Sequence, residues 1–424
     1  MSVIQSQRIP RRRVVVTGYG ALTAVGLDAE ESWQNLLRGQ SGVGPITQFD
    51  PTGYPSTIAA EVKGFVPPSF LDSKEARRMS RFELFALAST RQALDSAGLE
   101  ITDENADSIG VIVGTGIGSL TTSEQECKVM LERGGMRMNP FFLPMMLANM
   151  ATAQVTRVFG IRGYSSTVIT ACASGGQAIG EAAEVIRRGA ADIMIAGGSE
   201  ASVCELGLAS FCVLRALSTR NDDPAGASRP FDRDRDGMVP AEGAALLVLE
   251  SLESARRRGA RIYAEVLGYG VSSDAYHVVA PRPDGGGAAR AMERALSDAG
   301  IAPTDVDYIN AHATATVLGD VAETRAIKQV FGDHAYRMPI SATKSMIGHA
   351  MGAAGAIGAL VTVLSIRDGI VHPTINYRTP DPECDLDYVP NEARAVPVKI
   401  AMSNSFAFGG HNAVLVFGRF DPDS

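Results

Sequence analysis

Residues 93–99 read ALDSAGL, and nearly the same string, ALSDAGI, returns at residues 295–301. Each string closes an apolar periodic segment with a glycine, which is the pattern of a helix that stops at a left-handed residue. A second pair, IRRG at 186–189 and IRDG at 366–369, closes two further helical segments. The two pairs of similar strings are separated by similar long distances along the chain, which indicates that the chain consists of two similar halves.

Short apolar runs that are typical of buried strands alternate with these helical segments. They are VVVTG at 14–18, VIVG at 111–114, IMIAGG at 193–198 and ALLVLESL at 245–252. The alternation predicts an α/β fold. The simplest division places one α/β half at 12–258 and the other at 259–424, packed against each other.

Two helical segments are unusually rich in small residues: SGGQAIGEAA at 174–183 and GAAGAIGAL at 352–360. An interior glycine costs a helix about 1 kcal/mol relative to alanine, so such helices usually need their backbones close to a neighbour. We therefore expect both to be central, buried helices. The stretches 219–237 and 280–288 have the composition of loops.

Composition and charge exclude several classes of protein. The chain has 424 residues, 45% hydrophobic and 20% charged, which suits a large buried core and not a disordered chain. With 39 Lys and Arg against 47 Asp and Glu, the net charge of −8 provides no general attraction for nucleic acid or anionic lipid. We find no uncharged apolar run long enough to span a membrane, and the N-terminal MSVIQSQRIPRRR has no apolar core of a signal peptide.

Cysteine usage points to a reducing compartment. The five cysteines are an odd number without a CxxC pair, which argues against a disulfide framework and against a zinc ribbon. We therefore expect a cytoplasmic protein that has no metal site and binds neither nucleic acid nor membrane.

Cys172 is the first candidate catalytic residue. It lies in VITACASGG at 168–176, where an apolar strand ends and a glycine-rich helix begins. A helix N-terminus stabilises a thiolate and is expected to lower the pKa of such a thiol. The alternative is a small buried hydrophobe, as most free cysteines are. Cys127, Cys204, Cys212 and Cys384 lack this setting and are assigned that alternative.

Two of the six histidines lie in similar small-residue turns of the second half: His312 in NAHATAT and His349 in TKSMIGHAMGAAG. Together with Cys172 they would supply a nucleophile and two proton handlers or oxyanion donors. Lys344 could hold a histidine or a water by its charge, or be a solvated loop lysine. The turn NSFAFGGHN at 404–412 could offer N–H groups to an oxyanion and move as a lid, or be a plain hairpin.

Two glycine-rich strings, TGYGALTAVG at 17–26 and GTGIGS at 114–119, have some likeness to dinucleotide-binding loops. The first lacks a following strand with an acidic residue about 20 positions on, and the second does not continue into a glycine-containing helix start. A nicotinamide-dependent reductase is therefore kept as an alternative function.

Four blocks carry a family resemblance. TACASG at 170–175, HATATVLGD at 312–320, TKSMIGHAMGAAG at 343–355 and NSFAFGGHN at 404–412 resemble the signature blocks of type II β-ketoacyl-ACP synthases, in the family's order. The likeness runs from about Arg12 to Phe420 and includes RALSTRNDDP, ASRPFDRDRDG and SSDAYH.

The resemblance implies a thiolase fold, with two duplicated α/β halves in five α-β-α-β-α layers, normally as a dimer. It implies a decarboxylative Claisen condensation of acyl-ACP with malonyl-ACP, giving β-ketoacyl-ACP and CO2, in fatty-acid or type II polyketide elongation. A non-elongating chain-length-factor subunit shares the fold but is expected to lack the nucleophile. A degradative thiolase shares it too, but normally uses a second cysteine and coenzyme A.

The resemblance also implies roles for individual residues. Cys172 would accept the acyl group, His312 and His349 would hold the malonyl thioester, and Lys344 would orient the His349 side. Thr314 and Thr316 would bind the pantetheine arm, and the N–H groups of Cys172 and Phe408 would form the oxyanion hole. Phe406 and Phe408 resemble the gate of the acyl pocket. No cofactor is expected, because the acyl carrier protein carries the 4′-phosphopantetheine arm.

The partners implied are an acyl carrier protein and either a second copy of this chain or a chain-length-factor-like homologue. Because the carrier is expected to be acidic, it needs a basic docking patch on this acidic protein. Candidates by motif position are Lys74, Arg77, Arg78, Arg215 and Arg220.

Four positions depart from the family pattern. Ala313 and Ala407 replace glycines, Gly358 replaces a glutamate that we expect to contact the Lys344 network, and His411 replaces a frequent threonine. Because glycine visits positive φ at lower cost than alanine, Ala407 is expected to stiffen the gate. These changes favour a specialised, polyketide-type elongating enzyme.

Overall fold

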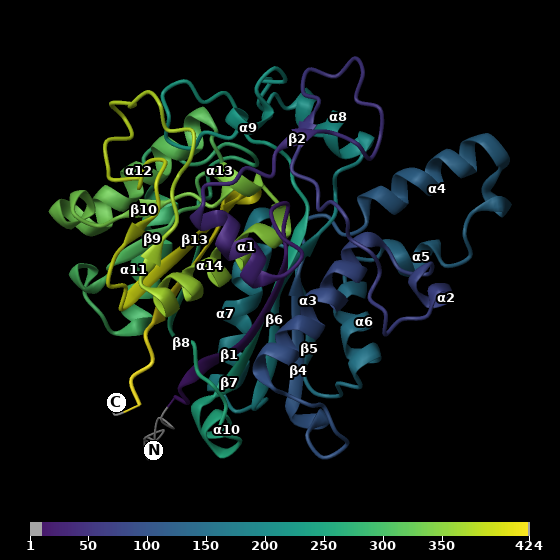
Figure 1. Ribbon diagram of the computed structural model, residues 1–424, viewed down its shortest axis with the longest axis horizontal. Helices are drawn as coiled ribbons and strands as arrows, with labels where there is room; N and C mark the ends of the chain where they lie inside the picture. The colour runs from purple at the N-terminus through teal and green to yellow at the C-terminus, as the bar shows by residue number, and fades with distance from the viewer. Residues whose placement is uncertain (1–10, 423–424) are drawn as a thin grey trace, which may run out of the picture.

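Two matching arrays of strands, one from each half of the chain, make up the main sheet of the computed structural model, which describes residues 11–422 (Figure 1). The first array runs β5 (Ser165–Val168), β4 (Ile109–Gly114), β6 (Ile193–Glu200), β7 (Gly243–Ser251) and β1 (Val14–Leu22). The second runs β8 (Ala264–Ser273), β14 (His411–Gly418), β13 (Ile400–Ala407), β9 (Tyr308–Asn310) and β10 (Ile340–Ser341). A short antiparallel pairing of β1 with β8, at Val15↔Glu265 and Val16↔Ala264, joins them.

The two arrays have the same pairing pattern. From the join outward, β1 pairs with β7 and β7 with β6 antiparallel, and then β6, β4 and β5 are parallel. In the second array β8 pairs with β14 and β14 with β13 antiparallel, and then β13, β9 and β10 are parallel. The predicted duplication is therefore confirmed. A division at 258/259 would cut the chain between α10 (Leu252–Arg257) and β8.

Helices cover both faces of each array in five layers, as expected. The outer layer of the first half contains α3 (Arg81–Ala97) and α6 (Met150–Phe159), and that of the second contains α11 (Gly286–Ala299) and α12 (Val317–Phe331). The middle layer consists of α7 (Ser174–Arg187) and α14 (Ala354–Asp368) (Figure 1). The three largest apolar cores of the described residues lie between the arrays around α7 and α14 and beneath each outer layer.

The small residues of α7 and α14 let the two middle helices touch through their backbones. A Cβ on Gly175 would lie 2.8 Å from the carbonyl oxygen of Gly352, and one on Gly355 would lie 2.6 Å from the backbone nitrogen of Gly176. The prediction of two central, tightly packed helices is confirmed. Among residues 11–422, the helical segment Met351–Asp368 has the length and composition of a membrane span, with mean hydropathy 1.3, but 89% of it is buried inside the protein.

Helix ends lie where the repeated strings predicted them. Gly98 after α3, Gly300 after α11 and Gly369 after α14 all have left-handed φ, between 56° and 68°. After α7 the left-handed residue is Gly189, with φ of 76°. A glycine in this conformation ends a helix without the steric cost that a Cβ would add.

The remaining elements lie outside the five layers. They are α1 (Ala29–Leu37), α2 (Ser73–Ala76), α4 (Leu120–Arg133), α5 (Phe142–Met146), α8 (Glu205–Val213), α9 (Pro224–Ala227), α13 (Lys344–Ile347) and the short strand pairs β2 (Gly44–Pro45) with β3 (Ile58–Ala59) and β11 (Ile370–Val371) with β12 (Arg394–Ala395). Figure 1 shows that α4 and α5 project from the body beside α2. The expectation about a targeting signal falls mainly on residues 1–10, which lie outside the described residues.

Glu83 makes the stability of α3 depend on pH. Its Oε1 accepts hydrogen bonds from the backbone N–H and the hydroxyl of Ser80, at 3.3 and 2.5 Å, and burial raises its pKa from 4.5 to about 7. Because the native protein then binds a proton more tightly than the unfolded chain, stability falls as pH rises from about 4.5 to 7.

Glu83→Gln is therefore expected to gain stability relative to the unmodified protein as pH rises from 5 to 8, by on the order of 1–3 kcal/mol. Urea unfolding followed by circular dichroism at both pH values measures the difference in unfolding free energy between the variant and the unmodified protein. Glu104→Gln, at an exposed position, serves as the control. A difference in unfolding free energy that stays constant between pH 5 and pH 8 would contradict the prediction.

Candidate active site

Cys172 lies at the bottom of the site, at the start of the middle layer. A single 3-10 turn, Ala171–Ala173, links β5 to α7 and places the cysteine just before the helix N-terminus. The turn is held by the Ser174 hydroxyl, which donates to the Ala171 carbonyl oxygen at 2.7 Å and accepts from the Thr170 N–H at 2.8 Å. The side chain is 9% exposed, so the thiol is accessible only through a narrow opening.

His349 and His312 reach this cysteine from the second half. The Nε2 of His349 lies 3.0 Å from the Cys172 Sγ. His349 follows α13, and His312 follows β9, so two loops at one end of the second array present both rings. The ring centroids are 5.5 Å apart, with the planes at 88°. The sequence prediction that these three residues meet is matched by this geometry.

Lys344 is the first residue of α13 and is buried. Its Nζ donates a hydrogen bond of 2.6 Å to the carbonyl oxygen of His312. The alternative of a solvated loop lysine is therefore wrong. Burial lowers the pKa of Lys344 from 10.5 to about 8, although the nearby Glu323 carboxylate favours the charged form.

Both histidines are neutral near pH 7. Burial lowers the pKa of His312 and of His349 well below 6.5, and the positive charge of Lys344 lowers both further. A neutral imidazole presents one N–H and one lone pair, so each ring can donate a hydrogen bond to a carbonyl oxygen.

The expected low pKa of Cys172 is wrong for this protein. Burial raises the pKa of the thiol from 9.0 to about 11, and the charge of Lys344 and the N–H groups of Phe408 and Cys172 offset only part of the rise. Desolvation penalises the thiolate more than the helix terminus stabilises it. At neutral pH the Cys172 sulfur beside His349 is therefore mainly in the S–H form.

Sequence reasoning missed Glu323, which lies on α12 and is buried. Its carboxylate accepts hydrogen bonds from the backbone N–H groups of His312 and Ala313, at 2.9 and 2.7 Å, and from the Asn404 side chain at 3.1 Å. It thus joins the His312 loop to the 404–412 turn. The available signal was a pair of acidic residues, Asp320 and Glu323, within the mainly small and apolar stretch VLGDVAET at 317–324.

The 404–412 segment is both a hairpin and a cover for the site. Strands β13 and β14 pair antiparallel up to Ala407↔His411, and the turn Phe408–Gly410 closes them. Phe408 presents its backbone N–H to the Cys172 sulfur, as expected for an oxyanion hole, and its ring lies 6.5 Å from that of Phe211. The Phe406 ring lies 5.8 Å from that of His312.

Ala407 does not occupy the strained conformation expected of it. Its φ is −140°, which is ordinary extended backbone, whereas the left-handed residues of the turn are Gly409 and Gly410, with φ of 80° and 71°. The stiffening argument therefore does not hold for position 407 in this conformation. His411 is exposed, and its ring packs beside Gly409, where a Cβ would lie 3.0 Å from the His411 Cδ2.

Thr314 and Thr316 line the segment that follows His312. Their hydroxyl oxygens are 3.1 Å apart, and Thr316 caps α12 by accepting from the Gly319 N–H at 3.2 Å. The intervening Ala315 and the preceding Ala313 are left-handed, with φ of 63° and 38°. The left-handed conformation costs each alanine roughly 1–2 kcal/mol relative to an ordinary backbone conformation, whereas a glycine at either position would adopt it without this cost.

Gly358 does not belong to the surroundings of Lys344. A Cβ at this position would lie 3.0 Å from the Asn310 Oδ1 and 3.3 Å from the Ser403 Oγ. The carboxylates that influence Lys344 are Glu323 and Asp320. The glycine therefore changes a buried polar cluster below β9 and leaves the acidic neighbours of Lys344 in place.

A narrow crevice of about 10 Å³, room for about one water molecule, lies near the gate. Its lining includes Phe49, Cys204, Leu208, Phe211 and Met351. Phe211 also neighbours Phe408, and Met351 follows His349 by two residues, so the side chains around this crevice adjoin the segments that carry the site. Within residues 11–422, no group of three His, Cys, Asp or Glu side chains could hold a metal ion.

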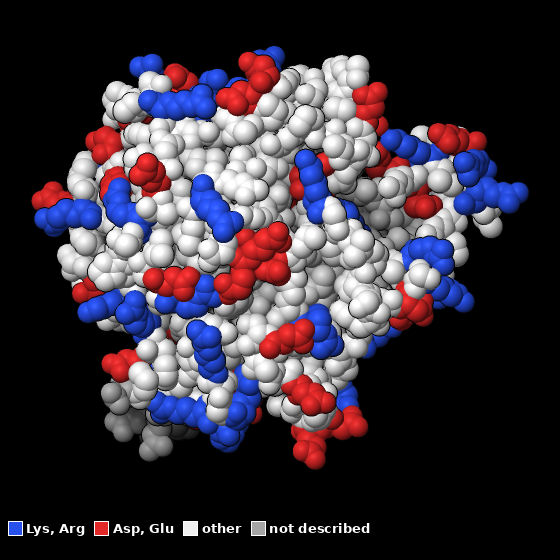
Figure 2. All heavy atoms as spheres, viewed as in Figure 1, with Lys and Arg blue, Asp and Glu red and all other residues white. Residues whose placement is uncertain are grey.

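The five expected docking residues fall into two groups. Lys74, Arg77 and Arg78 are exposed on and after α2, and the Arg78 guanidinium lies 4.3 Å from the Phe141 ring. Arg215 is exposed two residues after α8, whereas the Arg220 side chain is 34% exposed and donates to the Asp234 carbonyl oxygen at 2.6 Å. Figure 2 shows basic side chains along the projecting right edge, mixed with acidic ones.

Family models match most of the chain. The β-ketoacyl synthase N-terminal domain matches residues 11–255, and the β-ketoacyl synthase C-terminal domain matches residues 263–378. The chain is 51% identical over 412 residues to a 3-oxoacyl-[acyl-carrier-protein] synthase 2 of Synechocystis sp., covering 97% of this chain and 99% of the relative. It is 51% identical over 410 residues to the protein of the same name in Staphylococcus aureus, with the same coverage.

Solved structures give a consistent result. The ishigamide ketosynthase/chain length factor superposes with a TM-score of 0.91 at 40% identity, over 97% of this chain and 100% of that chain. A ketosynthase bound to a hexaketide, in complex with its type II polyketide synthase acyl-carrier protein, superposes with a TM-score of 0.89 at 38% identity, over the same shares.

Proposed function

Because the chain belongs to the β-ketoacyl synthase family, we propose that the cluster of Cys172, His312, His349 and Lys344 performs this family's condensation. The chain is a β-ketoacyl-[acyl-carrier-protein] synthase that joins an acyl group to malonyl-ACP with loss of CO2, in fatty-acid or type II polyketide elongation. The single observation that carries the assignment of these residues is the approach of His349 to 3.0 Å from the Cys172 sulfur, with His312 beside it.

Acyl transfer to Cys172 is the first step. The thiol adds to the thioester carbonyl of the acyl-carrier protein, and the N–H groups of Cys172 and Phe408 hold the oxyanion that forms. The thiol proton passes to the departing pantetheine thiolate while the neutral His349 ring stays in contact with the sulfur. The acyl group remains on Cys172, and His349 keeps its own N–H for the second step.

Condensation is the second step. The N–H groups of His312 and His349 donate to the thioester oxygen of malonyl-ACP, so that the negative charge formed on loss of CO2 is stabilised as an enolate. The enolate carbon attacks the acyl carbonyl on Cys172, a carbon–carbon bond forms, and the carbon–sulfur bond breaks. The sulfur leaves as a thiolate and takes up one proton from solvent, which restores the Cys172 thiol. Thr314 and Thr316 hold the pantetheine arm, and Phe406 and Phe408 open and close the route to the acyl cavity.

A direct test supplies the protein with acyl-ACP and malonyl-ACP. Intact mass should show an acylated enzyme first, and then β-ketoacyl-ACP together with one CO2 per product. NADPH should not be consumed by the purified protein alone, which excludes the reductase alternative. Absence of any acyl-enzyme would leave only the non-elongating chain-length subunit.

We propose that the carrier protein docks on exposed basic residues, among them Arg78 and Arg215. Charge reversal in the double variant Arg78→Glu/Arg215→Glu is expected to raise the KM for carrier-bound substrate several-fold and to flatten its dependence on salt, because it removes long-range attraction. Arg220 is expected to contribute little, since its side chain is already engaged with Asp234. Steady-state kinetics at 50 and 300 mM salt measure the change.

Arg256→Glu, on exposed α10 at the opposite end of the molecule, is the matched control and should leave the KM unchanged (Figure 1). An unaltered KM and salt dependence in the double variant would remove this surface from the proposal.

We infer that two copies of the chain, or this chain and a chain-length-factor-like homologue, associate through the β5 edge. β5 is the terminal strand of its array, so its outer backbone groups are free to pair with another strand. Ile169, the residue after β5, is 56% exposed, and further exposed apolar side chains lie on the projecting α4–α5 segment of the same half, with Leu131 81%, Met136 98% and Leu143 63% exposed. Such a patch is typical of an interface.

Leu143→Asp is expected to weaken this association at least tenfold, because it places a charge in an apolar interface. Light scattering over a range of protein concentrations measures the mass. Val66→Asp, at a position that is 74% exposed outside this segment, is the control. A monomeric unmodified protein would overturn the inference of a homodimer and leave the heterodimer.

The carrier protein supplies the pantetheine arm, so the proposed condensation needs no cofactor bound to this chain. The five cysteines are all free thiols, which fits the proposed reducing cytoplasm.

A further inference from the structure

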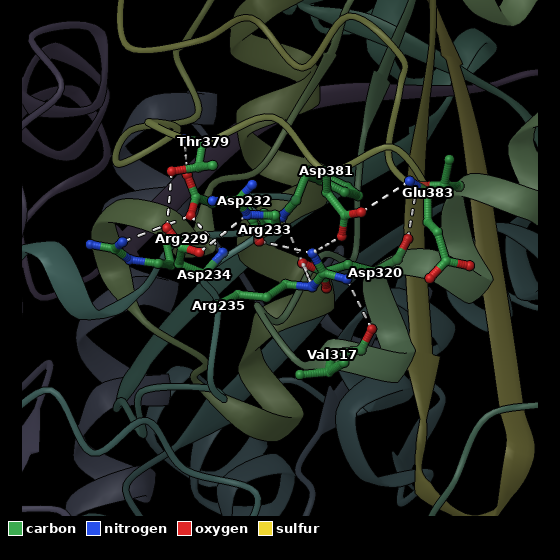
Figure 3. A network of polar contacts seen from close by, with 12 residues as sticks. Arg229, Asp232, Arg233, Asp234, Arg235, Val317, Asp320, Thr379, Asp381 and Glu383 are labelled. Carbon is green, nitrogen blue, oxygen red and sulfur yellow. Dashed lines mark hydrogen bonds and ion pairs between the residues drawn. The ribbon is translucent and has the colours of Figure 1, made fainter.

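A buried ion network surrounds Arg235, in the stretch 219–237 that the sequence marks as a loop. Its side chain is 2% exposed, and the carboxylates of Asp320 and Asp381 lie on two sides of it (Figure 3). The Arg235 Nη1 donates to Asp381 at 2.6 Å and to the Asp232 carbonyl oxygen at 2.8 Å, and the Nε lies 3.8 Å from Asp320. These acidic partners fix the guanidinium in one orientation.

The rest of the guanidinium holds the start of α12. Arg235 Nε donates to the Thr316 carbonyl oxygen at 3.2 Å, and Nη2 donates to that of Val317 at 3.0 Å. The N–H of Gly237 donates to the Ala315 carbonyl oxygen at 3.1 Å. Three successive carbonyl groups, at 315, 316 and 317, are therefore held by two residues of the 235–237 segment.

This position is electrostatically costly for an arginine. The N-terminal end of a helix carries partial positive charge, so a cation is unfavourable there unless carboxylates balance it. Asp320 and Asp381 supply that balance, and Asp232 holds the neighbouring loop by accepting from the backbone N–H groups of Arg378 and Thr379 at 2.6 and 2.7 Å. Apolar side chains packed at this place could supply as much stability as the ion network does. What the ion network adds is a fixed geometry of the backbone.

The backbone held in this way is strained. Ala313 and Ala315 are left-handed although neither is glycine, and such a conformation persists only where the surroundings impose it. Glu323 and Lys344 hold the His312 end of the segment, and Arg235 holds the Thr316 end. Release of either end would let the alanines return to an ordinary conformation.

We propose that Arg235 is a positioning residue that keeps the 312–317 segment in the shape in which Thr314 and Thr316 receive the pantetheine arm. This rests on the proposed function of those threonines. Arg235 touches no reacting atom. It acts through the carbonyl groups of Thr316 and Val317, and its planar fork can bond these two and Asp381 at once, which an ammonium group on a flexible stem cannot do with the same geometry.

The test begins with Arg235→Lys, which keeps the charge that balances Asp320 and Asp381. We expect the KM for malonyl-ACP and for acyl-ACP to rise at least tenfold. The rate at which iodoacetamide alkylates Cys172, a reaction that needs no pantetheine arm, should change less than twofold. Loss of the fold would instead change the alkylation rate together with the KM, because it would expose the buried Cys172.

The second variant adds Ala315→Gly to Arg235→Lys. Because glycine adopts the left-handed conformation without strain, the 312–317 segment should keep its shape without the bonds from Arg235. The KM of the double variant should therefore be at least threefold lower than that of Arg235→Lys. The matched control is Asn391→Gly in the same background, a left-handed position outside the 312–317 segment, which should restore nothing.

If Arg235→Lys does not fold, Asp381→Asn replaces it, because this change weakens only one of the bonds that orient the guanidinium. It should raise the KM about threefold with alkylation unchanged. An unchanged KM in the folded variant, or a raised KM that Ala315→Gly fails to restore, would overturn the proposal. Failure of the unmodified protein to condense acyl-ACP with malonyl-ACP would instead overturn the proposed function.

Discussion

Cys172→Ala is expected to abolish acyl transfer, with a fall in condensation of about a thousandfold or more, because no other group in the site can form the thioester. The other cysteines offer no substitute. Cys172 differs from the buried Cys204 and Cys384 in that the Nε2 of His349 lies 3.0 Å from its sulfur. Intact mass and peptide mapping after incubation with acyl-ACP measure whether and where an acyl group is attached.

Cys127→Ala, at an exposed thiol on α4, is the matched control and should retain both acylation and condensation. Thermal unfolding of the two variants should differ from the unmodified protein by only a few degrees. An acyl group found on any cysteine other than Cys172 would refute the assignment.

Lys344→Met is expected to slow the alkylation of Cys172 by about 10–100-fold at pH 7, because a nearby positive charge lowers a thiol pKa by about 1–2 units. The Lys344 charge is one of the influences that hold the pKa of Cys172 down, against the burial that raises it to about 11. Methionine fills a similar volume without the charge and without the hydrogen bond to the His312 carbonyl oxygen.

The pH dependence supplies a second readout of Lys344. Below the thiol pKa, the thiolate fraction and the alkylation rate rise tenfold per pH unit. Burial lowers the pKa of Lys344 to about 8, so above pH 8 the lysine loses its charge, the thiol pKa rises, and the slope becomes shallower. The Lys344→Met variant should rise with an even slope through this range.

Lys344→Arg keeps a positive charge at all of these pH values, and should therefore rise with an even slope while alkylating faster than the methionine variant. A methionine variant that alkylates at the rate of the unmodified protein would show that the charge of Lys344 does not reach the sulfur.

The sequence was informative where structure follows from local preference. The repeated strings around Gly98 and Gly300 predicted where α3 and α11 end, because a left-handed glycine terminates a helix whatever surrounds it. The glycines of α7 and α14 predicted close backbone packing for a similar local reason, since their cost within a helix has to be offset by contact. The two-half architecture followed from these repeats.

The candidate site was predicted in part. The motifs named Cys172, His312, His349 and Lys344, and the structure brings them together from both halves. Glu323 was missed because an acidic residue in a helix usually faces solvent, and nothing in its neighbourhood along the chain shows that its partners come from His312, Ala313 and Asn404.

Motif and repeat therefore determined the reaction class and the duplicated architecture and predicted the nucleophile, whereas only the tertiary structure decided the electrostatics of the site. The N-terminal position of Cys172 predicted a low thiol pKa, but burial by residues distant in the chain reverses the direction. The loop-like composition around Arg235 gave no sign of a buried ion network with Asp320 and Asp381. Helix ends depend on neighbouring residues, while desolvation and charge pairing depend on segments that only folding brings within a few ångströms.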